Sequence, residues 1–209
     1  MASRSISAYG LLFMGLLMSS ITLAQFRLPP FDIELKVQET FIPSDNNNNQ
    51  TATVTTDYLE TTNFYGAAHL QIGQHLALGW LYAQSFRGTL QYSTSNSSQA
   101  SPPDGKASLL MFGPDIRYAT SRAKKTRFSI SFNYTQIEFV DDKGTYRLAH
   151  KSNAVGLSLG IVKRLSNTID LNLIELGSKG FLGEKAFWME AGMMLEVKTG
   201  LTFNFSKRK

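Results

Sequence analysis

Apolar and polar residues alternate with a period of two along most of the chain after residue 30. In the segment 31–41, one face carries Phe31, Ile33, Leu35, Val37 and Phe41, and the other carries Asp32, Glu34, Lys36, Gln38 and Thr40. Such alternation predicts β-strands, because successive side chains of a strand point to opposite sides. Seven more segments show the pattern, near residues 62–73, 76–87, 107–118, 127–139, 155–161, 169–173 and 189–205. We therefore expect an all-β chain of about eight strands.

The predicted connections alternate between short and long. Short turns are expected around Gly73 and at Ser166–Asn167, with a basic turn of medium length between the fourth and fifth strands. Longer polar loops are expected at 42–61, 88–106 and 177–188, and a smaller one at 141–144. An even strand count with short turns at one end and long loops at the other is typical of outer-membrane barrels. The predicted fold is an antiparallel up-and-down transmembrane β-barrel.

The composition of the two faces predicts which one points outward. The central apolar faces carry no charge, as expected where Lys or Arg at the bilayer midplane would cost about 2–4 kcal/mol. The opposite faces are rich in Gly, Ser, Asn and Thr and hold scattered charges of both signs. We expect the apolar face to meet lipid, and the inward charges to pair with one another; these are Glu34, Lys36, Asp115, Arg117, Glu196 and Lys198.

Aromatic residues gather toward the predicted strand ends, as in the interfacial girdles of membrane barrels. Phe31, Tyr118, Phe128, Phe203 and Phe205 belong to the short-turn end, and Phe41, Phe64, Tyr82, Phe86 and Tyr134 belong to the long-loop end.

The alternation is interrupted at three places, near Glu138–Phe139, between residues 146 and 153, and at Ile174–Leu176. We expect bulges there, or strands that extend above the membrane. Pro114 within the fourth strand also requires a bulge or a position where its missing amide is tolerated.

The N-terminus has the features of an export signal. Arg4 is followed by the apolar run 11–18 and by the small-residue stretch Thr22–Ala24. The apolar run is shorter than the roughly 20 residues of a membrane-spanning helix. We therefore expect residues 1–24 to be a cleaved signal peptide and residues 25–209 to be the outer-membrane barrel domain. A retained N-terminal anchor is the alternative.

Composition agrees with an exported membrane barrel. Charged residues make up 18% of the 209 residues, against about 25% in soluble domains, and cysteine is absent. The formal net charge is +5, with basic clusters at 122–127, 163–164 and 207–209. Export argues against nucleic acid as the partner of these clusters. We interpret them as solvated turns and a tail close to anionic lipid.

Three motifs resemble those of a known group. They are Gly113-Pro114-Asp115-Ile116-Arg117-Tyr118, the run 155–160 leading through a short turn into 169–171, and Gly200-Leu201-Thr202-Phe203-Asn204-Phe205. On these the chain resembles the small porin-like outer-membrane β-barrel family that is common in Bacteroidetes and related to OmpA/OmpX-type barrels. The resemblance implies the architecture and the outer-membrane location. Many such barrels end on an aromatic residue, whereas this chain continues with Ser206-Lys207-Arg208-Lys209.

One segment suggests catalysis. His150-Lys151-Ser152-Asn153 resembles the His-x-Ser-Asn signature of outer-membrane lipid A deacylases, which are also eight-stranded barrels. The resemblance implies Ser152 as nucleophile and His150 as its base. The acidic partner of that family should lie about a dozen residues after the serine, where this chain has Lys163-Arg164. The alternative is an ordinary polar segment at the outer rim.

Other reactive patterns are better explained by structure. Gly156-Leu157-Ser158-Leu159-Gly160 matches a nucleophile elbow, but no helical pattern follows it and no histidine comes after it. His69 and His75 flank a turn without enough convergent ligands for a metal. Glu190 and Glu196 are too far apart along a strand for glycosidase chemistry and suit an interior ion network. No cofactor motif is present.

The sequence thus predicts a non-enzymatic barrel of the cell outer membrane with a structural, adhesion or assembly-partner role. The external loops would recognise a protein partner of the cell envelope, and outer-membrane lipid would surround the barrel. The first alternative is a lipid A deacylase-like hydrolase that uses His150 and Ser152. The second is a soluble periplasmic carrier of a hydrophobic ligand.

Overall fold

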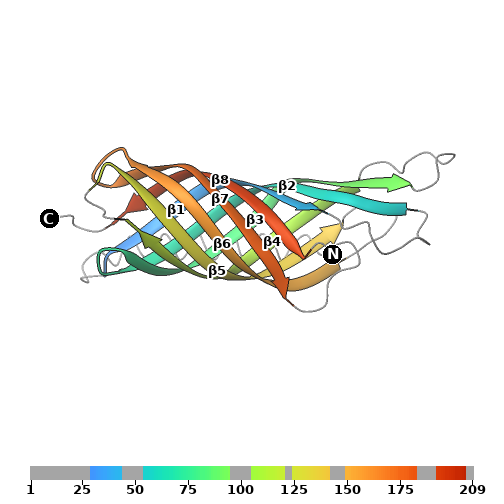
Figure 1. Cartoon of the computed structure of the whole chain (residues 1–209), viewed down its shortest axis with the longest axis horizontal. Coiled ribbons are helices and arrows are strands. Elements are labelled where there is room, and N and C mark those ends of the chain that lie inside the picture. The colour runs from blue at the N-terminus through green and yellow to red at the C-terminus, as the bar shows by residue number, and fades with distance from the viewer. Residues whose placement is uncertain are drawn as a thin grey trace.

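The alternating segments form eight β-strands in the computed structural model, which describes residues 29–43, 54–94, 105–120, 124–141, 149–182 and 192–205. Each strand pairs antiparallel with its sequence neighbours, and β1 pairs with β8, so the sheet closes into a barrel (Figure 1). The strands are β1 (Phe31–Pro43), β2 (Val54–Ile72), β3 (Leu76–Thr94), β4 (Gly105–Ala119), β5 (Thr126–Asp141), β6 (Ala149–Arg164), β7 (Ile169–Leu182) and β8 (Met193–Asn204). The predicted fold class is confirmed. No helix among these residues has the length and apolar character needed to cross a bilayer.

The two ends of the barrel differ. Short connections at 73–75, 120–125 and 165–168 lie at the end where β1 starts and β8 finishes. The longer connections 44–53, 95–104, 142–148 and 183–192 belong to the opposite end, and β2 and β3 extend farthest there (Figure 1). Gly73 adopts a φ of 73° in the turn between β2 and β3, a conformation that glycine tolerates without strain.

The strands are longer than the sequence pattern predicts. β2 and β3 each contain 19 residues, whereas a tilted strand crosses a bilayer with about 9–11. The loops are therefore shorter than the ranges predicted for them, 42–61, 88–106 and 177–188, because residues at the flanks of these ranges continue the strands. Polar residues in these parts pair in the sheet as well as apolar ones do, and their outward side chains change from apolar to polar.

The apolar faces point outward, as predicted. Leu35 is 50% exposed, while its neighbour Glu34 is fully buried. The same relation holds around the barrel at the level of the apolar belt, where buried polar side chains face inward and exposed aliphatic or aromatic ones face outward. A soluble carrier would bury its apolar face, so the sidedness of this sheet contradicts that alternative.

Aromatic pairs mark the two edges of the apolar belt. Phe31 stacks on Phe205 at 4.6 Å near the short turns, and Phe64 lies 4.5 Å from Phe86 near the long loops. From Phe31 to Phe41, β1 advances ten residues; at ~3.3 Å per residue and a tilt of ~40° this is about 25 Å, the height of a membrane barrel's apolar band.

Beyond the long-loop edge of the belt, the two faces exchange character. In β5, Phe139 points inward and is buried, while Glu138 points outward and forms an ion pair with Lys151 at 2.7 Å. The pairing of β5 with β6 is regular through this point. The interruption predicted near Glu138–Phe139 is thus a strand extension above the membrane. Outside lipid, the outward face meets water and the inward face becomes the apolar one.

Bulges in β7 and β3 change the direction of side chains. In β7, both Leu173 and Ile174 are exposed, and the register with β8 shifts between Asn172 and Glu175. This confirms the interruption predicted at Ile174–Leu176. In β3, Thr62 faces Arg87 and Asn63 faces Ser85, so Phe86 is the extra residue.

The bulge in β3 corrects one prediction. The period-two pattern predicted for 76–87 places Arg87 on the inward face with Ala83, but Arg87 is exposed on the outward side, since the extra residue reverses the alternation. Pro114 occupies an outward, exposed position where the ladder between β4 and β5 is interrupted, at Gly113 and Pro114. The tolerated position predicted for this proline is therefore observed.

Candidate functional site in the barrel interior

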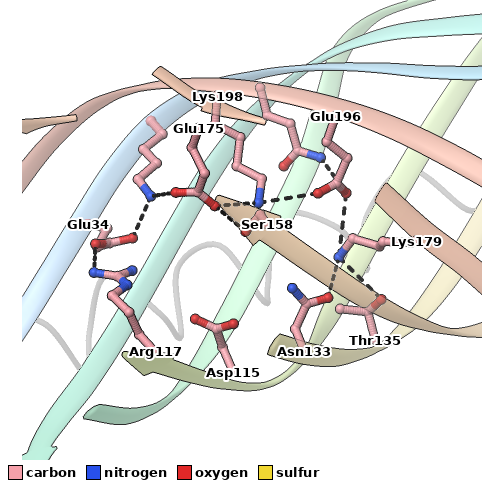
Figure 2. Close-up of polar contacts among 12 residues, drawn as sticks. Glu34, Asp115, Arg117, Asn133, Thr135, Ser158, Glu175, Lys179, Glu196 and Lys198 are labelled. Atoms are coloured by element: carbon pink, nitrogen blue, oxygen red, sulfur yellow. Dashed lines mark hydrogen bonds and ion pairs between the residues drawn. The ribbon is translucent and has the colours of Figure 1, made fainter. Parts of the chain in front are cut away.

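A continuous chain of ion pairs crosses the barrel interior (Figure 2). Arg117 of β4 pairs with Glu34 of β1. Lys36 Nζ lies 2.8 Å from Glu34 Oε2 and 2.5 Å from Glu175 Oε2, which links β1 to β7. Lys198 of β8 continues the chain, with its Nζ 2.9 Å from Glu175 Oε1. Charges from four strands are thereby joined.

The chain ends on a third carboxylate, Glu196, and a third lysine, Lys179. Glu196 Oε2 lies 3.2 Å from Lys198 Nζ, and Glu196 Oε1 lies 3.5 Å from Lys179 Nζ. We call these residues the luminal network: Glu34, Lys36, Arg117, Glu175, Lys179, Glu196 and Lys198. Positive and negative groups alternate along it, so each buried charge has an opposite neighbour, as buried ions require.

Uncharged groups complete the surroundings of Glu175. Ser158 Oγ donates a hydrogen bond to Glu175 Oε1 at 2.7 Å. The ring of Tyr65 lies 5.3 Å from Lys36 Nζ and 5.0 Å from Lys198 Nζ, within the range of cation–π attraction. Glu175 is therefore the centre of the network, and the bulge in β7 is what turns it inward.

Beside the network, Asp115 Oδ2 lies 2.7 Å from His69 Nε2. Gly79 lies opposite His69 in the ladder, and a Cβ at Gly79 would stand 2.5 Å from the imidazole Cδ2. Glycine at this position therefore leaves the space that the imidazole fills.

The sequence anticipated most of these positions. The inward placement and pairing expected of Glu34, Lys36, Arg117, Glu196 and Lys198 are observed, and Asp115 pairs with His69. Glu175 and Lys179 were missed, because one lay at the interrupted alternation and the other in a predicted Gly-rich loop. A signal was present: residues 175, 177 and 179 resume the period-two pattern after the interruption.

The luminal network closes the barrel at its level. The side chains of Lys36 and Lys198 are each 1% exposed, and that of Glu34 is 0% exposed. Solvent thus does not reach these groups, as expected because side chains just fill an eight-stranded barrel. No open passage runs through this layer of the described residues.

Above the network, toward the long loops, the interior is apolar. Phe139 lies 6.4 Å from Phe181, and Met194 is fully buried. The buried cluster also contains Ile42, Leu59, Leu81, Leu109, Met111 and Ile137. The lumen is thus sealed twice, by ions in one layer and by packed apolar side chains in the other.

The two candidate hydrolase residues lie in the first part of β6. Ser152 faces the interior opposite Ile137, is 8% exposed, and donates a 3.4 Å hydrogen bond to the carbonyl of Asn153. The backbone of His150 is two residues earlier, opposite Phe139, on the same face of the strand. The His150 side chain lies outside the described residues, so the proposed base–nucleophile pair stays a prediction.

The other reactive patterns have structural roles. The segment 156–160 is strand, with Ser158 bound to Glu175. His75 Nδ1 lies 2.9 Å from the carbonyl of Ala119. Glu196 belongs to the luminal network, while Glu190 lies outside the described residues. Within the described ranges, no three His, Cys, Asp or Glu side chains converge as a metal site would require.

Comparison with known proteins shows the fold. Neisserial surface protein A superimposes with a TM-score of 0.60 at 12% identity, covering 84% of this chain and 97% of the other. The outer membrane protein OprG of Pseudomonas aeruginosa gives 0.57 at 10% identity, covering 85% and 96%. The N-terminal β-barrel domain of Pseudomonas aeruginosa OprF gives 0.51 at 11% identity, covering 84% and 97%. No family model and no curated protein matches the chain.

These similarities agree with the outward apolar belt. The chain is an eight-stranded transmembrane β-barrel of the outer-membrane type, and the cell outer membrane is the location that this fold and surface fit.

Proposed function

We propose that the protein is a non-enzymatic outer-membrane barrel that presents its long-loop end to a partner in the cell envelope or on another surface. The observation that carries the proposal is the doubly sealed lumen, in which buried ions lie below packed apolar side chains. A barrel filled in this way has no room for a diffusing solute. The surface that binds a partner must then lie outside the lumen.

The shape of the long-loop end supports recognition there. β2 and β3 continue beyond the belt as a paired, two-stranded extension and are followed by the connections 95–104 and 44–53 (Figure 1). Above the belt the outward wall is polar, with Glu60 and Lys151 exposed. Rigid strands that carry loops are a common arrangement for binding surfaces. Neisserial surface protein A has, as its name states, a surface location and shares this fold.

The assignment to the Bacteroidetes-type small barrels is supported by the three sequence motifs, and the adhesion or assembly role by the sealed lumen and the extended strands. The deacylase-like alternative has the shared face of His150 and Ser152 as its support.

Two experiments test the proposal. The first records ionic current through the purified barrel in planar lipid bilayers; we expect no steady conductance, and a stable open channel would contradict the proposal. The second places a photo-crosslinking amino acid at Tyr58 or Lys151, at the long-loop end, and at Gln74 or Asn167, at the short-turn end. We expect protein cross-links in whole cells from the first pair of positions. Cross-links from the second pair alone would overturn the assignment of the recognition surface.

A further inference from the structure

A polar hollow lies on the outward wall of the barrel, where the apolar belt ends. It has a volume of about 200 Å³ and is lined by Glu39, Glu60, Thr62, Arg87 and Thr89. These residues come from β1, β2 and β3 and share the outward face of three adjacent strands. The hollow therefore opens toward the surrounding membrane and not into the lumen.

The sheet register brings the lining residues together. Thr62 faces Glu39 on one side and Arg87 on the other, and Thr62 Oγ1 donates a 3.0 Å hydrogen bond to Glu39 Oε2. Glu60 faces Thr89 one outward position higher, and Thr89 in turn faces Lys106 of β4. Carboxylates thus occupy one side of the hollow and Arg87 the other, and Lys106 follows on the next strand.

The bulge in β3 builds this arrangement. Without the extra residue Phe86, regular alternation would turn Arg87 into the lumen. The bulge places its guanidinium beside Thr62, on the lipid-facing wall. Bulges commonly serve to re-aim a side chain, and here the reversal delivers a cation to a position opposite Glu39.

The hollow stands at the level of lipid headgroups. On β1 the outward Glu39 lies between Val37 and Phe41, at the upper edge of the belt, and on β2 the outward residues change from Phe64 to Thr62. Tyr82 lies at the same boundary on β3, where its hydroxyl donates to Gln84 Oε1 at 2.7 Å. Such aromatic and polar positions mark the interface between acyl chains and headgroups. The hollow therefore lies at the height where the polar group of a neighbouring lipid would be.

We propose that this hollow binds the zwitterionic headgroup of an outer-leaflet lipid, one that carries a primary ammonium and a phosphate. The two carboxylates receive the ammonium, Arg87 receives the phosphate, and the threonine hydroxyls supply further hydrogen bonds. Two carboxylates on one side and Arg87 on the other match the two charges of such a headgroup, whereas a purely anionic lipid would be repelled by Glu39 and Glu60. The acyl chains then run down the outward wall past Tyr82 and Trp80.

Trp80 makes this binding measurable. It is exposed on the lipid-facing wall of β3, below the hollow, so brominated acyl chains of a bound lipid would quench its fluorescence. Trp188 is the second tryptophan of the chain and is removed by Trp188→Phe. This barrel is reconstituted in phosphatidylcholine vesicles that contain a minor fraction of brominated phosphatidylethanolamine, phosphatidylglycerol or phosphatidylcholine. A heat-dependent shift in gel mobility verifies folding of every variant.

We expect brominated phosphatidylethanolamine to quench as if enriched roughly three- to tenfold over the other two, the gain of one or two charge-assisted hydrogen bonds at an exposed site. Glu39→Gln with Glu60→Gln, or Arg87→Gln alone, should abolish the enrichment. The matched control is Glu138→Gln with Lys151→Gln, which removes an outward ion pair at the same rim. The enrichment of phosphatidylethanolamine should persist in this variant. Equal quenching by all three lipids in the unmodified hollow would overturn the proposal.

Two competitors identify the source of the headgroup. An unlabelled glycolipid decorated with phosphoethanolamine that relieves quenching better than phosphatidylethanolamine would support the proposal with a glycolipid as occupant. The reverse order would support it with a phospholipid. Relief by water-soluble phosphoethanolamine at a concentration equal to that of the lipid would overturn it, because the site would then recognise a soluble molecule and not a membrane lipid.

Discussion

Lys36 and Glu175 are 139 residues apart in the chain, yet the Nζ of one lies 2.5 Å from Oε2 of the other inside the barrel. β8 lies between their strands in the sheet, so the contact spans a strand through the lumen. Glu175 also binds Lys198 of β8 at 2.9 Å. One carboxylate thus connects three consecutive strands around the closure of the barrel, and the two cations depend on it for their charge balance.

Removing that carboxylate should destabilise the barrel strongly. Glu175→Gln leaves two buried lysines beside a neutral amide, and breaking a buried ion pair from one side costs about 3–5 kcal/mol. The measurement is the free energy of unfolding in urea, with the barrel in detergent micelles or lipid vesicles. Glu138→Gln is the matched control, since its ion pair with the exposed Lys151 should contribute less than about 1 kcal/mol. Similar losses for both variants would show that the luminal network does not stabilise the fold.

Gly79 should not tolerate a side chain. A Cβ there would stand 2.1 Å from the carbonyl oxygen of Ala68 and 2.5 Å from Cδ2 of His69. We expect Gly79→Ala to reduce the folded fraction and to cost about 1–3 kcal/mol or more, because a strand and a buried imidazole must both move. Gly180→Ala is the control, since its nearest neighbour would be 3.9 Å away. The heat-dependent gel shift of refolded protein compares the two, and equal folding yields would contradict the close packing at Gly79.

A charge on the lipid-facing wall should be costly at mid-height and cheap at the rim. Leu159 and Asn153 share the outward face of β6, and both are exposed. Leu159→Lys should lower the free energy of unfolding in vesicles by about 2–4 kcal/mol, while Asn153→Lys, at the polar rim, should lower it by about 0–1 kcal/mol. The comparison tests where the acyl region ends. Equal small effects would mean that Leu159 faces water and that the barrel does not span a bilayer.

The sequence was sufficient to predict the strands and their sidedness, because lipid imposes a simple rule on the belt. Leu35 and Leu157 had to face out and Glu34 had to face in once the apolar face met acyl chains. The rule fails above the membrane, where water makes the opposite arrangement favourable. Phe139 inside and Glu138 outside therefore looked like an irregularity, although the backbone continues without one.

Parts of both sites depend on bulges, which period-two reasoning does not resolve. One extra residue in β7 turns Glu175 inward, and one in β3 turns Arg87 outward. Each reversal of side-chain direction depends on which residue has no pairing partner in the neighbouring strand, and this is visible only in the register of the sheet. The interruption at Ile174 was visible as a conflict of parity, while Phe86 and Arg87 each fitted a regular alternation and gave no warning.

A direct test of the hydrolase alternative concerns Ser152, whose inward side chain is 8% exposed and lies opposite Ile137 in β6. If the barrel is non-enzymatic, mass spectra of lipid A should be identical in cells that express the original chain, Ser152→Ala, or His150→Gln. The Ser152 hydroxyl makes one 3.4 Å hydrogen bond to a carbonyl, so its removal should change the folding free energy by less than about 1 kcal/mol. If cells with fully folded Ser152→Ala protein carry one more acyl chain on lipid A than cells with the original chain, the protein is a deacylase and the proposal of a non-enzymatic barrel is wrong. Lys163→Gln is a suitable control, because this exposed residue precedes the short turn after β6 and should leave the spectra unchanged under either reading.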